Sequence, residues 1–309
     1  MFTMRSFACL SLLLTLMTGL MPHPAHAGTE QEHQDHPAPL LSCVEPVWCD
    51  IAQQIGGPEL RTHALITSEG MDPHHLQPSP LMARQLATSD AVLLNGATYD
   101  DWAVKLLPTK MKLFLAADYA GWLAGADPHL FFDLPTVRKT AEQIAAWLSE
   151  VRPQAKQDIE KRLAQFETRI DQISGRLDAI SQTDHGAPFA MTEPAGERLL
   201  LAAGLEMTDQ NWARALMNES GLSPYDTAML ETAIKQKAIR FLVRNPAISA
   251  PQAQTVETLA HQAGIPVISI GESLPAGIHW QDWLNQLITE LEGALKQTAP
   301  HGTPAQTTP

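Results

Sequence analysis

Two loop segments of the chain place a histidine in the same local order. Asp72-Pro73-His74 and Asp127-Pro128-His129 each put an imidazole directly after an Asp-Pro pair. Proline fixes one backbone dihedral, so less entropy is lost when the neighbouring side chain is held in one place. Imidazole is a common ligand of transition-metal ions. His74 and His129 are therefore candidate metal ligands, and His75 is the alternative at the first position.

Two glutamates follow apolar strand-like segments in the second half of the chain. Glu193 lies in Met191-Thr192-Glu193-Pro194, and Glu272 lies in Ile270-Gly271-Glu272-Ser273. Carboxylate oxygen suits harder cations than imidazole does. Two imidazoles and two carboxylates would together neutralise a divalent ion, so we treat these four residues as one candidate set.

The elements that must position these residues alternate between strand and helix. Short apolar runs are followed by amphipathic stretches, which predicts an α/β fold with mainly parallel sheets. We expect strands at 40–44, 63–66, 91–94, 112–116, 189–191, 239–243 and 265–270. We expect helices at 48–55, 80–88, 136–150, 195–203, 252–263 and 280–295. Ligands of open α/β sheets bind beyond the carboxyl ends of the strands, where all four candidates fall.

One long helix separates the two series of strands. Its apolar positions alternate spacings of four and three residues, which predicts a single stripe along the helix. The stripe contains Ile159, Leu163, Phe166, Ile170, Ile173, Leu177 and Ile180. A coiled-coil dimer is one interpretation of such a heptad pattern. We favour a helix that packs along its own chain, between two α/β lobes.

These motifs together resemble a known family. The segment 44–57, the Asp-Pro-His-His-x-x-Pro-Ser-Pro run from Asp72 and Asn95-Gly96 are similar to the first lobe of cluster A-I solute-binding proteins. Asp127-Pro128-His129 with Phe132-Asp133 is similar to that family's Asn-Pro-His…Trp-Leu-Asp-Pro motif. The Thr192-Glu193-Pro194, 264–267 and Gly271-Glu272 segments match its second lobe. Members are the zinc- and manganese-binding receptors of ABC importers.

The resemblance implies a metal buried between the lobes, with His74, His129, Glu193 and Glu272 as its ligands. It also implies a monomer that delivers Mn²⁺ or Zn²⁺ to an inner-membrane ABC permease. Asp72 and Asp133 are candidates to orient the imidazoles, although capping and turn roles suit them equally. The sequence departs from the family at Asp127, where Asn is usual, and carries Glu193 where zinc-specific members have His. It also has no His-rich loop between residues 95 and 127, and both of these last points favour manganese or mixed use.

The ends of the chain predict export. Arg5, the apolar run from Phe7 to Leu20 and the small residues around Ala27 predict a signal peptide that is cleaved after Ala27, so we expect a periplasmic protein. The expected organisation is a signal peptide at 1–27, a disordered leader at 28–39, a first lobe at 40–152, the connecting helix at 153–182, a second lobe at 183–297 and a disordered tail at 298–309.

Charge and cysteine content narrow the class further. The formal net charge of −13 argues against nucleic acid as a partner. Cys43 and Cys49 remain after signal cleavage, and they form either a disulfide or two buried thiols.

Two other functions would be compatible with the same candidate metal ligands. A metallohydrolase would leave one coordination position open for water, and the chain has neither a His-Glu-x-x-His nor a Gly-x-Ser-x-Gly motif. A structural or adhesive protein braced by its metal is the third class. We favour a receptor, and no enzymatic activity, because four protein ligands drawn from two lobes suit capture of an ion.

Metal affinity should depend on pH. Both imidazoles must be neutral to ligate, and their reference pKa is about 6.5. We therefore expect affinity to fall below about pH 6, and a titration that shows constant affinity from pH 7 to pH 5 would contradict imidazole ligation.

Overall fold

The computed structural model describes residues 37–67 and 73–298 of the chain. From Ala38 on, these residues form one compact unit. The expected signal peptide, most of the expected leader and nearly all of the expected tail lie outside the described residues. The expected domain boundaries therefore stay predictions.

The first lobe is a four-stranded parallel sheet with helices between its strands. Its strand order is β2-β1-β3-β4, and Leu41 of β1 pairs with Thr62 on one side and Ala91 on the other. In chain order the elements are β1 (Leu40–Cys43), α1 (Pro46–Gly56), β2 (Arg61–Ala64), α2 (Pro80–Ala87), β3 (Ala91–Leu94), β4 (Lys112–Leu115), α3 (Ala116–Ala120) and α4 (Leu134–Val151).

The second lobe repeats this winding. Its parallel sheet has the order β6-β5-β7-β8. The elements are β5 (Pro188–Met191), α6 (Glu197–Ala202), β6 (Glu206–Met207), α7 (Gln210–Met217), α8 (Pro224–Lys235), β7 (Phe241–Arg244), α9 (Pro251–Ala263), β8 (Val267–Ser269) and α10 (Trp280–Gln297). The predicted fold class, two α/β lobes with parallel sheets and one long helix, is confirmed.

Some predicted elements differ from the observed ones. The second strand ends at Ala64 rather than at Ile66, and the last strand is confined to Val267–Ser269. The helices α7 and α8 and the strand β6 were not predicted. A hydrophobic residue that is buried in the loop next to a strand cannot be distinguished by sequence from a residue of the strand itself. This explains why the predicted strand ends extend into the loops.

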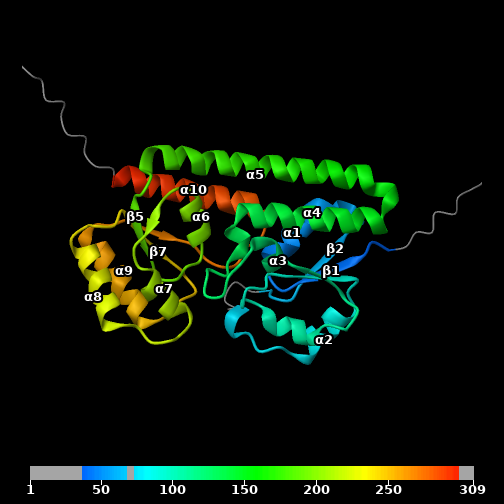
Figure 1. The fold of residues 1–309 in the computed structure, drawn as a ribbon, viewed down its shortest axis with the longest axis horizontal. Coiled ribbons are helices and arrows are strands. Elements are labelled where there is room, and N and C mark those ends of the chain that lie inside the picture. Colours follow the sequence, from blue (N-terminus) through cyan, green and yellow to red (C-terminus); the bar gives the residue numbers. More distant parts are fainter. Residues whose placement is uncertain (1–36, 68–72, 299–309) are drawn as a thin grey trace, which may run out of the picture. The chain divides into compact units, whose positions relative to one another are not determined.

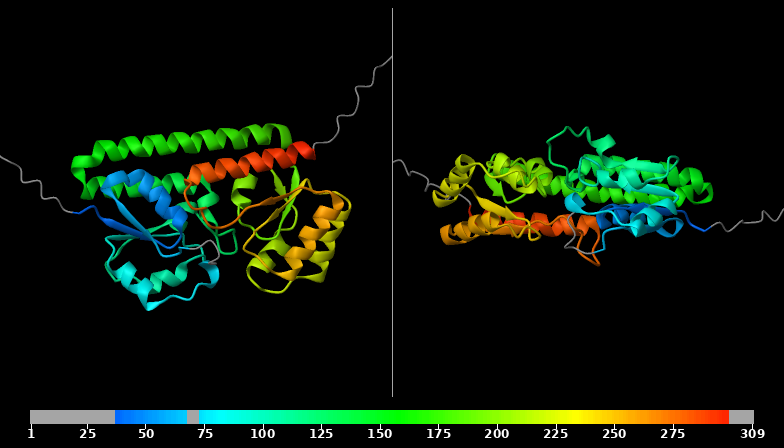
Figure 2. Two further views of the ribbon diagram at one scale, coloured as in Figure 1. Left: turned by 180° about the vertical axis from the view of Figure 1, so that it is seen from behind. Right: turned by 90° about the horizontal axis from the view of Figure 1, so that it is seen from below.

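The helix α5 (Lys156–Asp184) connects the lobes, and α10 lies beside it (Figures 1 and 2). Six of the seven stripe residues are buried, and Leu163 is partly buried. They pack against α1, α4 and α10 of the same chain. The stripe is therefore covered without a second copy, in agreement with the favoured interpretation.

Buried apolar residues of both lobes form one continuous cluster. Aromatic side chains cross from one lobe to the other: Phe131 stacks on Trp283 of α10 with ring centroids 6.2 Å apart. The indole of Trp280 donates a hydrogen bond of 2.8 Å to the carbonyl of Phe131. The carboxylate of Asp50 in α1 accepts the first backbone N–H of α10 at 2.8 Å. These contacts tie the second lobe to the first without using the candidate ligand atoms, although the ring of Phe131 also lies edge-on to the ring of His129, with centroids 6.0 Å apart.

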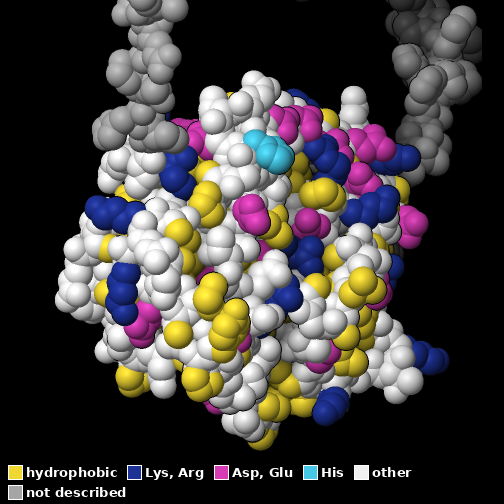
Figure 3. Space-filling model, turned by 60° about the vertical axis from the view of Figure 1, so that its left-hand side comes forward, with side chains coloured by type: hydrophobic (Ala, Val, Ile, Leu, Met, Phe, Trp, Pro, Cys, Tyr) yellow, Lys and Arg dark blue, Asp and Glu magenta, His cyan; other side chains and the backbone are white. Residues whose placement is uncertain are grey.

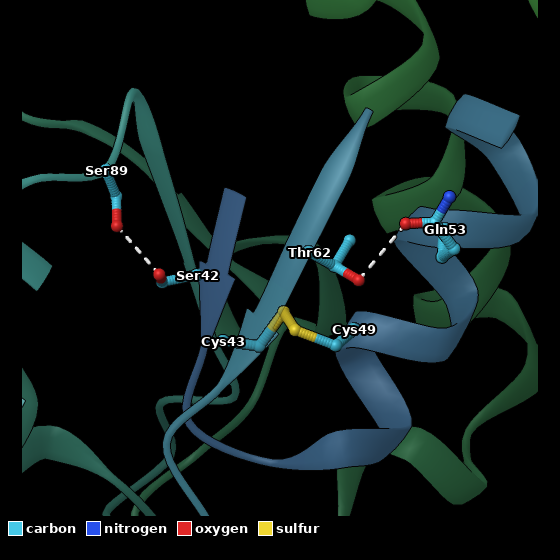
Figure 4. Close-up of a disulfide and its surroundings, with 6 residues drawn as sticks. All are labelled: Ser42, Cys43, Cys49, Gln53, Thr62 and Ser89. Atoms are coloured by element: carbon cyan, nitrogen blue, oxygen red, sulfur yellow. Dashed lines mark hydrogen bonds between the residues drawn. A yellow bond between two sulfur atoms is a disulfide. The ribbon is translucent and has the colours of Figure 1, made fainter. Parts of the chain in front are cut away.

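Cys43 and Cys49 are joined by a disulfide (Figure 4). It links the end of β1 to α1 within the first lobe, across a sequence separation of 6 residues. Of the two interpretations open from sequence, the disulfide is the observed one, and it fixes the start of α1 against the sheet.

The surface mixes charges of both signs. On the face drawn in Figure 3, acidic and basic side chains are interspersed with apolar ones. Within residues 37–67 and 73–298, no helix has both the length and the apolar character that a membrane crossing requires.

Truncating the stripe should destabilise the fold without affecting association. Ile173 is completely buried, so Ile173→Ala should lower the free energy of unfolding by about 2–5 kcal/mol. Leu123→Ala removes an exposed side chain and should change it by less than about 0.5 kcal/mol. Denaturant unfolding measures both values. A midpoint that rises with protein concentration would instead indicate the coiled-coil dimer.

Candidate metal centre

The four candidate ligands converge from four separate loops. His74 lies in the 3-10 helix η2 (Pro73–His75), and His129 directly precedes η4 (Leu130–Phe132). Glu193 follows β5, and Glu272 follows β8. Each residue offers one nitrogen or oxygen, and these atoms all lie within 4.8 Å of one another. His129, Glu193 and Glu272 are buried, and His74 is partly buried.

Asp127 orients the imidazole of His129. One carboxylate oxygen of Asp127 lies 2.6 Å from Nδ1 of His129 and also accepts the His129 backbone N–H at 3.0 Å. This contact assigns the ring proton to Nδ1, so the lone pair of the neutral ring lies on Nε2. Nε2 in turn lies 3.4 Å from Oε2 of Glu272. The ring therefore presents its ligating atom to the second lobe.

The loop that carries His129 is held from both lobes. Asn95, at the end of β3, donates to the carbonyl of Pro128 at 2.8 Å and accepts the indole N–H of Trp48 at 3.3 Å. Arg198 of α6 donates to the carbonyl of Asp127 through two nitrogens, at 2.8 and 3.1 Å.

Gly96 allows the turn that places Asn95. Its φ of +71° is disfavoured for other residues, and a Cβ there would lie 2.8 Å from the side chain of Leu115. The Asn95-Gly96 pair singled out in the sequence thus serves the backbone around His129.

The two glutamates are linked by a single amide. Nδ2 of Asn245, the residue after β7, donates one hydrogen bond to Oε2 of Glu193 and another to Oε1 of Glu272. The hydroxyl of Tyr99, from the first lobe, donates to Oε2 of Glu272 at 3.0 Å. Glu272 is therefore fixed from both lobes.

Burial and mutual charge shift the pKa values of this cluster in opposite directions. Burial would lower the pKa of His129, but the charge and hydrogen bond of Asp127, together with Glu272, raise it well above 6.5. Burial and the charge of Glu272 raise the pKa of Glu193 to about 8. Burial would raise the pKa of Glu272 as well, yet the hydrogen bond and charge of His129 lower it to about 2. These directions favour an imidazolium at His129, a carboxylate at Glu272 and a carboxylic acid at Glu193 in the metal-free cluster.

Of the two residues expected to orient the imidazoles, the structure describes Asp133. Asp133 caps α4 by accepting the backbone N–H of Thr136 at 3.2 Å, which is the capping role weighed from sequence. Asp72 and the side chain of His75 lie outside what the structure describes.

Three residues at the cluster were not singled out in these roles by the sequence. From the sequence alone, Asp127 was considered only as a difference from the family motif. Its position two residues before His129 could have indicated that it contacts the imidazole. Tyr99 and Asn245 reach the cluster from other loops, and their order along the chain gives no indication of it.

Two imidazole nitrogens and two carboxylate oxygens are the donor set of a divalent transition-metal ion. The two parallel-sheet lobes present these donors to one another from four loops, an arrangement that suits the binding of a metal ion.

The comparisons with known proteins give the family. The family model described as "ZnuA: Zinc-uptake complex component A periplasmic" matches residues 43–294. The chain therefore belongs to this family, which consists of substrate-binding receptors for metal import and not of enzymes.

Individual relatives are distant. The manganese ABC transporter substrate-binding lipoprotein PsaA of Streptococcus pneumoniae is 26% identical over 141 residues, which cover 40% of this chain and 45% of that protein. The chain thus matches less than half of the length of this curated relative.

Two solved structures are similar over most of the chain. The periplasmic zinc-binding protein TroA of Treponema pallidum has a TM-score of 0.69 at 17% identity and covers 83% of this chain and 99% of its own. A Zn(II)-bound mutant variant of AdcAII from Streptococcus pneumoniae has a TM-score of 0.68 at 17% identity and covers 85% and 99%. At these identities the likeness shows a shared fold.

The protonation of His129 in the metal-free protein can be tested directly. We expect a doubly protonated ring at pH 7, and Asp127→Asn should lower the pKa of His129, because it removes the charge that opposes burial. Imidazole ¹⁵N NMR distinguishes the two states, and the exposed His261 serves as the internal control. A neutral His129 at pH 7 in the unsubstituted protein would contradict the assigned role of Asp127.

Proposed function

We propose that this chain is a periplasmic receptor that binds one divalent transition-metal ion, Zn²⁺ or Mn²⁺, through His74, His129, Glu193 and Glu272. It then delivers the ion to an ABC permease of the inner membrane. The receptor acts as a monomer, catalyses no reaction and does not bind nucleic acid. The expected cleavage after Ala27 belongs to the same proposal.

One observation carries this proposal: four donor atoms from four loops of two lobes lie within 4.8 Å of one another. Two carboxylates that are buried this closely repel one another unless a proton or a cation lies between them. A divalent ion would replace that proton and neutralise the carboxylates. Membership of a family of metal-import receptors supports the same conclusion and the ABC permease as partner.

The alternatives from sequence are less well supported. A catalytic metal usually keeps an open position for water, whereas four protein donors can complete a tetrahedral site. A structural protein braced by its metal is also less well supported, because the apolar cluster already connects the lobes without a metal.

The shifted pKa values raise the pH at which metal affinity is expected to fall, compared with the value of about pH 6 expected from reference pKa values. Protons compete with the metal for His129, whose pKa lies well above 6.5, and for Glu193, whose pKa is about 8. Because both protons must leave, affinity should begin to fall below about pH 8 rather than about pH 6. Glu272 keeps its charge throughout this range.

Titration calorimetry of the purified protein tests the proposal. We expect one ion per chain and a loss of affinity of more than about 100-fold in His129→Ala, since even residues that only orient a ligand are worth about 10–100-fold. His261→Ala removes an exposed imidazole on α9 and should leave affinity unchanged. Equal affinity in the His129→Ala protein, or no binding of either ion by the unsubstituted protein, would refute the proposal.

A further inference from the structure

Asn245 lies at the point where the two carboxylates meet. It is 4% exposed, and it directly follows β7, the strand between β5 and β8 whose ends lead to Glu193 and Glu272. An amide nitrogen carries two hydrogens, and here each has a carboxylate acceptor. The donor capacity of this group is therefore used completely by the two glutamates.

The orientation of the amide is fixed by its own loop. Oδ1 of Asn245 accepts the backbone N–H of Ala247 at 3.0 Å. The carbonyl of Asn245 accepts the N–H of Ile248, and its own N–H donates to the hydroxyl of Thr192, the residue before Glu193. Rotating the amide would break the Ala247 contact and turn an oxygen toward two acidic groups. Nδ2 is therefore held against the carboxylates.

In each glutamate, one carboxylate oxygen accepts a hydrogen bond from Asn245 and the other does not. Oε1 of Glu272 faces Asn245, whereas Oε2 faces Nε2 of His129 at 3.4 Å and the hydroxyl of Tyr99. Oε2 of Glu193 faces Asn245, which leaves its Oε1. A carboxylate that binds an ion through both oxygens would bring the cation against the partly positive N–H groups of Asn245. Binding through one oxygen avoids that repulsion, because the O–H of Tyr99 at Oε2 of Glu272 can rotate away from an ion, whereas the amide of Asn245 is held in place.

We propose that Asn245 is a specificity-determining residue that limits Glu193 and Glu272 to one ligating oxygen each. This inference rests on the proposed function of the same four ligands. With two imidazoles, the site then supplies four donors, a number that completes the tetrahedral sphere of Zn²⁺. Mn²⁺ favours six ligands that are mainly oxygen, so the limit to one oxygen per glutamate should weaken Mn²⁺ binding more than Zn²⁺ binding. The inference reverses the preference for manganese that Glu193 suggested from sequence alone.

The test compares Zn²⁺ and Mn²⁺ affinities of the purified protein and three variants. Asn245→Ala removes the amide. Asn245→Leu keeps a side chain of similar size that donates nothing to the glutamates and adds no metal ligand. Asn285→Ala removes a partly buried amide in α10 that contacts Arg176 rather than the site, and it is the matched control. If Asn245→Ala does not fold, the comparison is made with Asn245→Leu.

We expect both Asn245 variants to reduce the ratio of Zn²⁺ to Mn²⁺ affinity by about tenfold or more, because the freed oxygens add donors that Mn²⁺ can use. X-ray absorption of the zinc-loaded unsubstituted protein should show four nitrogen or oxygen neighbours, and Asn285→Ala should keep the original ratio. A purely positional role would instead weaken both ions equally and leave the ratio unchanged, which would overturn this inference. A higher coordination number in the unsubstituted protein would overturn it as well, while the proposed function would stand. If neither ion bound, both would fail.

Discussion

Two glutamates and two histidines converge at one point, where His129 and both glutamates are buried and are held by hydrogen bonds from Asp127, Tyr99 and Asn245. Two like charges this close cannot both persist in a metal-free, buried site without compensation. The shifted pKa values favour an imidazolium at His129, a carboxylate at Glu272 and a carboxylic acid at Glu193. Asp127 contacts His129, Tyr99 contacts Glu272, and Asn245 contacts both glutamates. The cluster is thus prepared for a divalent charge, and protons occupy it when no ion is bound.

Such a cluster needs a frame that resists separation of the lobes. The continuous apolar core, the aromatic contacts of Phe131 with Trp283 and the capping of α10 by Asp50 connect the lobes independently of the donors. The helix α5 lies across both lobes, with its apolar stripe buried. We therefore expect the site to open through the loops that follow β5, β7 and β8 rather than through a hinge between rigid bodies.

The sequence predicted the fold well wherever the hydrophobic period was strong. The stripe of α5, the buried strand at Ala91–Leu94 and the final helix were located within two or three residues. The helix α8 is only weakly amphipathic and lacked such a period, whereas the amphipathic helix α7 displays one over its 8 residues and was overlooked. The four candidate ligands could be selected because each follows a strand or stands in an Asp-Pro-His segment. Asn245 and Tyr99 could not, since their roles depend on hydrogen bonds between loops far apart in the chain.

One ion should occupy the space between these four side chains, and every other role assigned to the cluster depends on it. Anomalous diffraction at the absorption edge of the metal, from crystals of the metal-loaded protein, tests this most directly. We predict a single strong peak within bonding distance of Nε2 of His129, a nitrogen of His74 and one oxygen each of Glu193 and Glu272. A principal peak elsewhere, or one that contacts residues of a single lobe only, would contradict it.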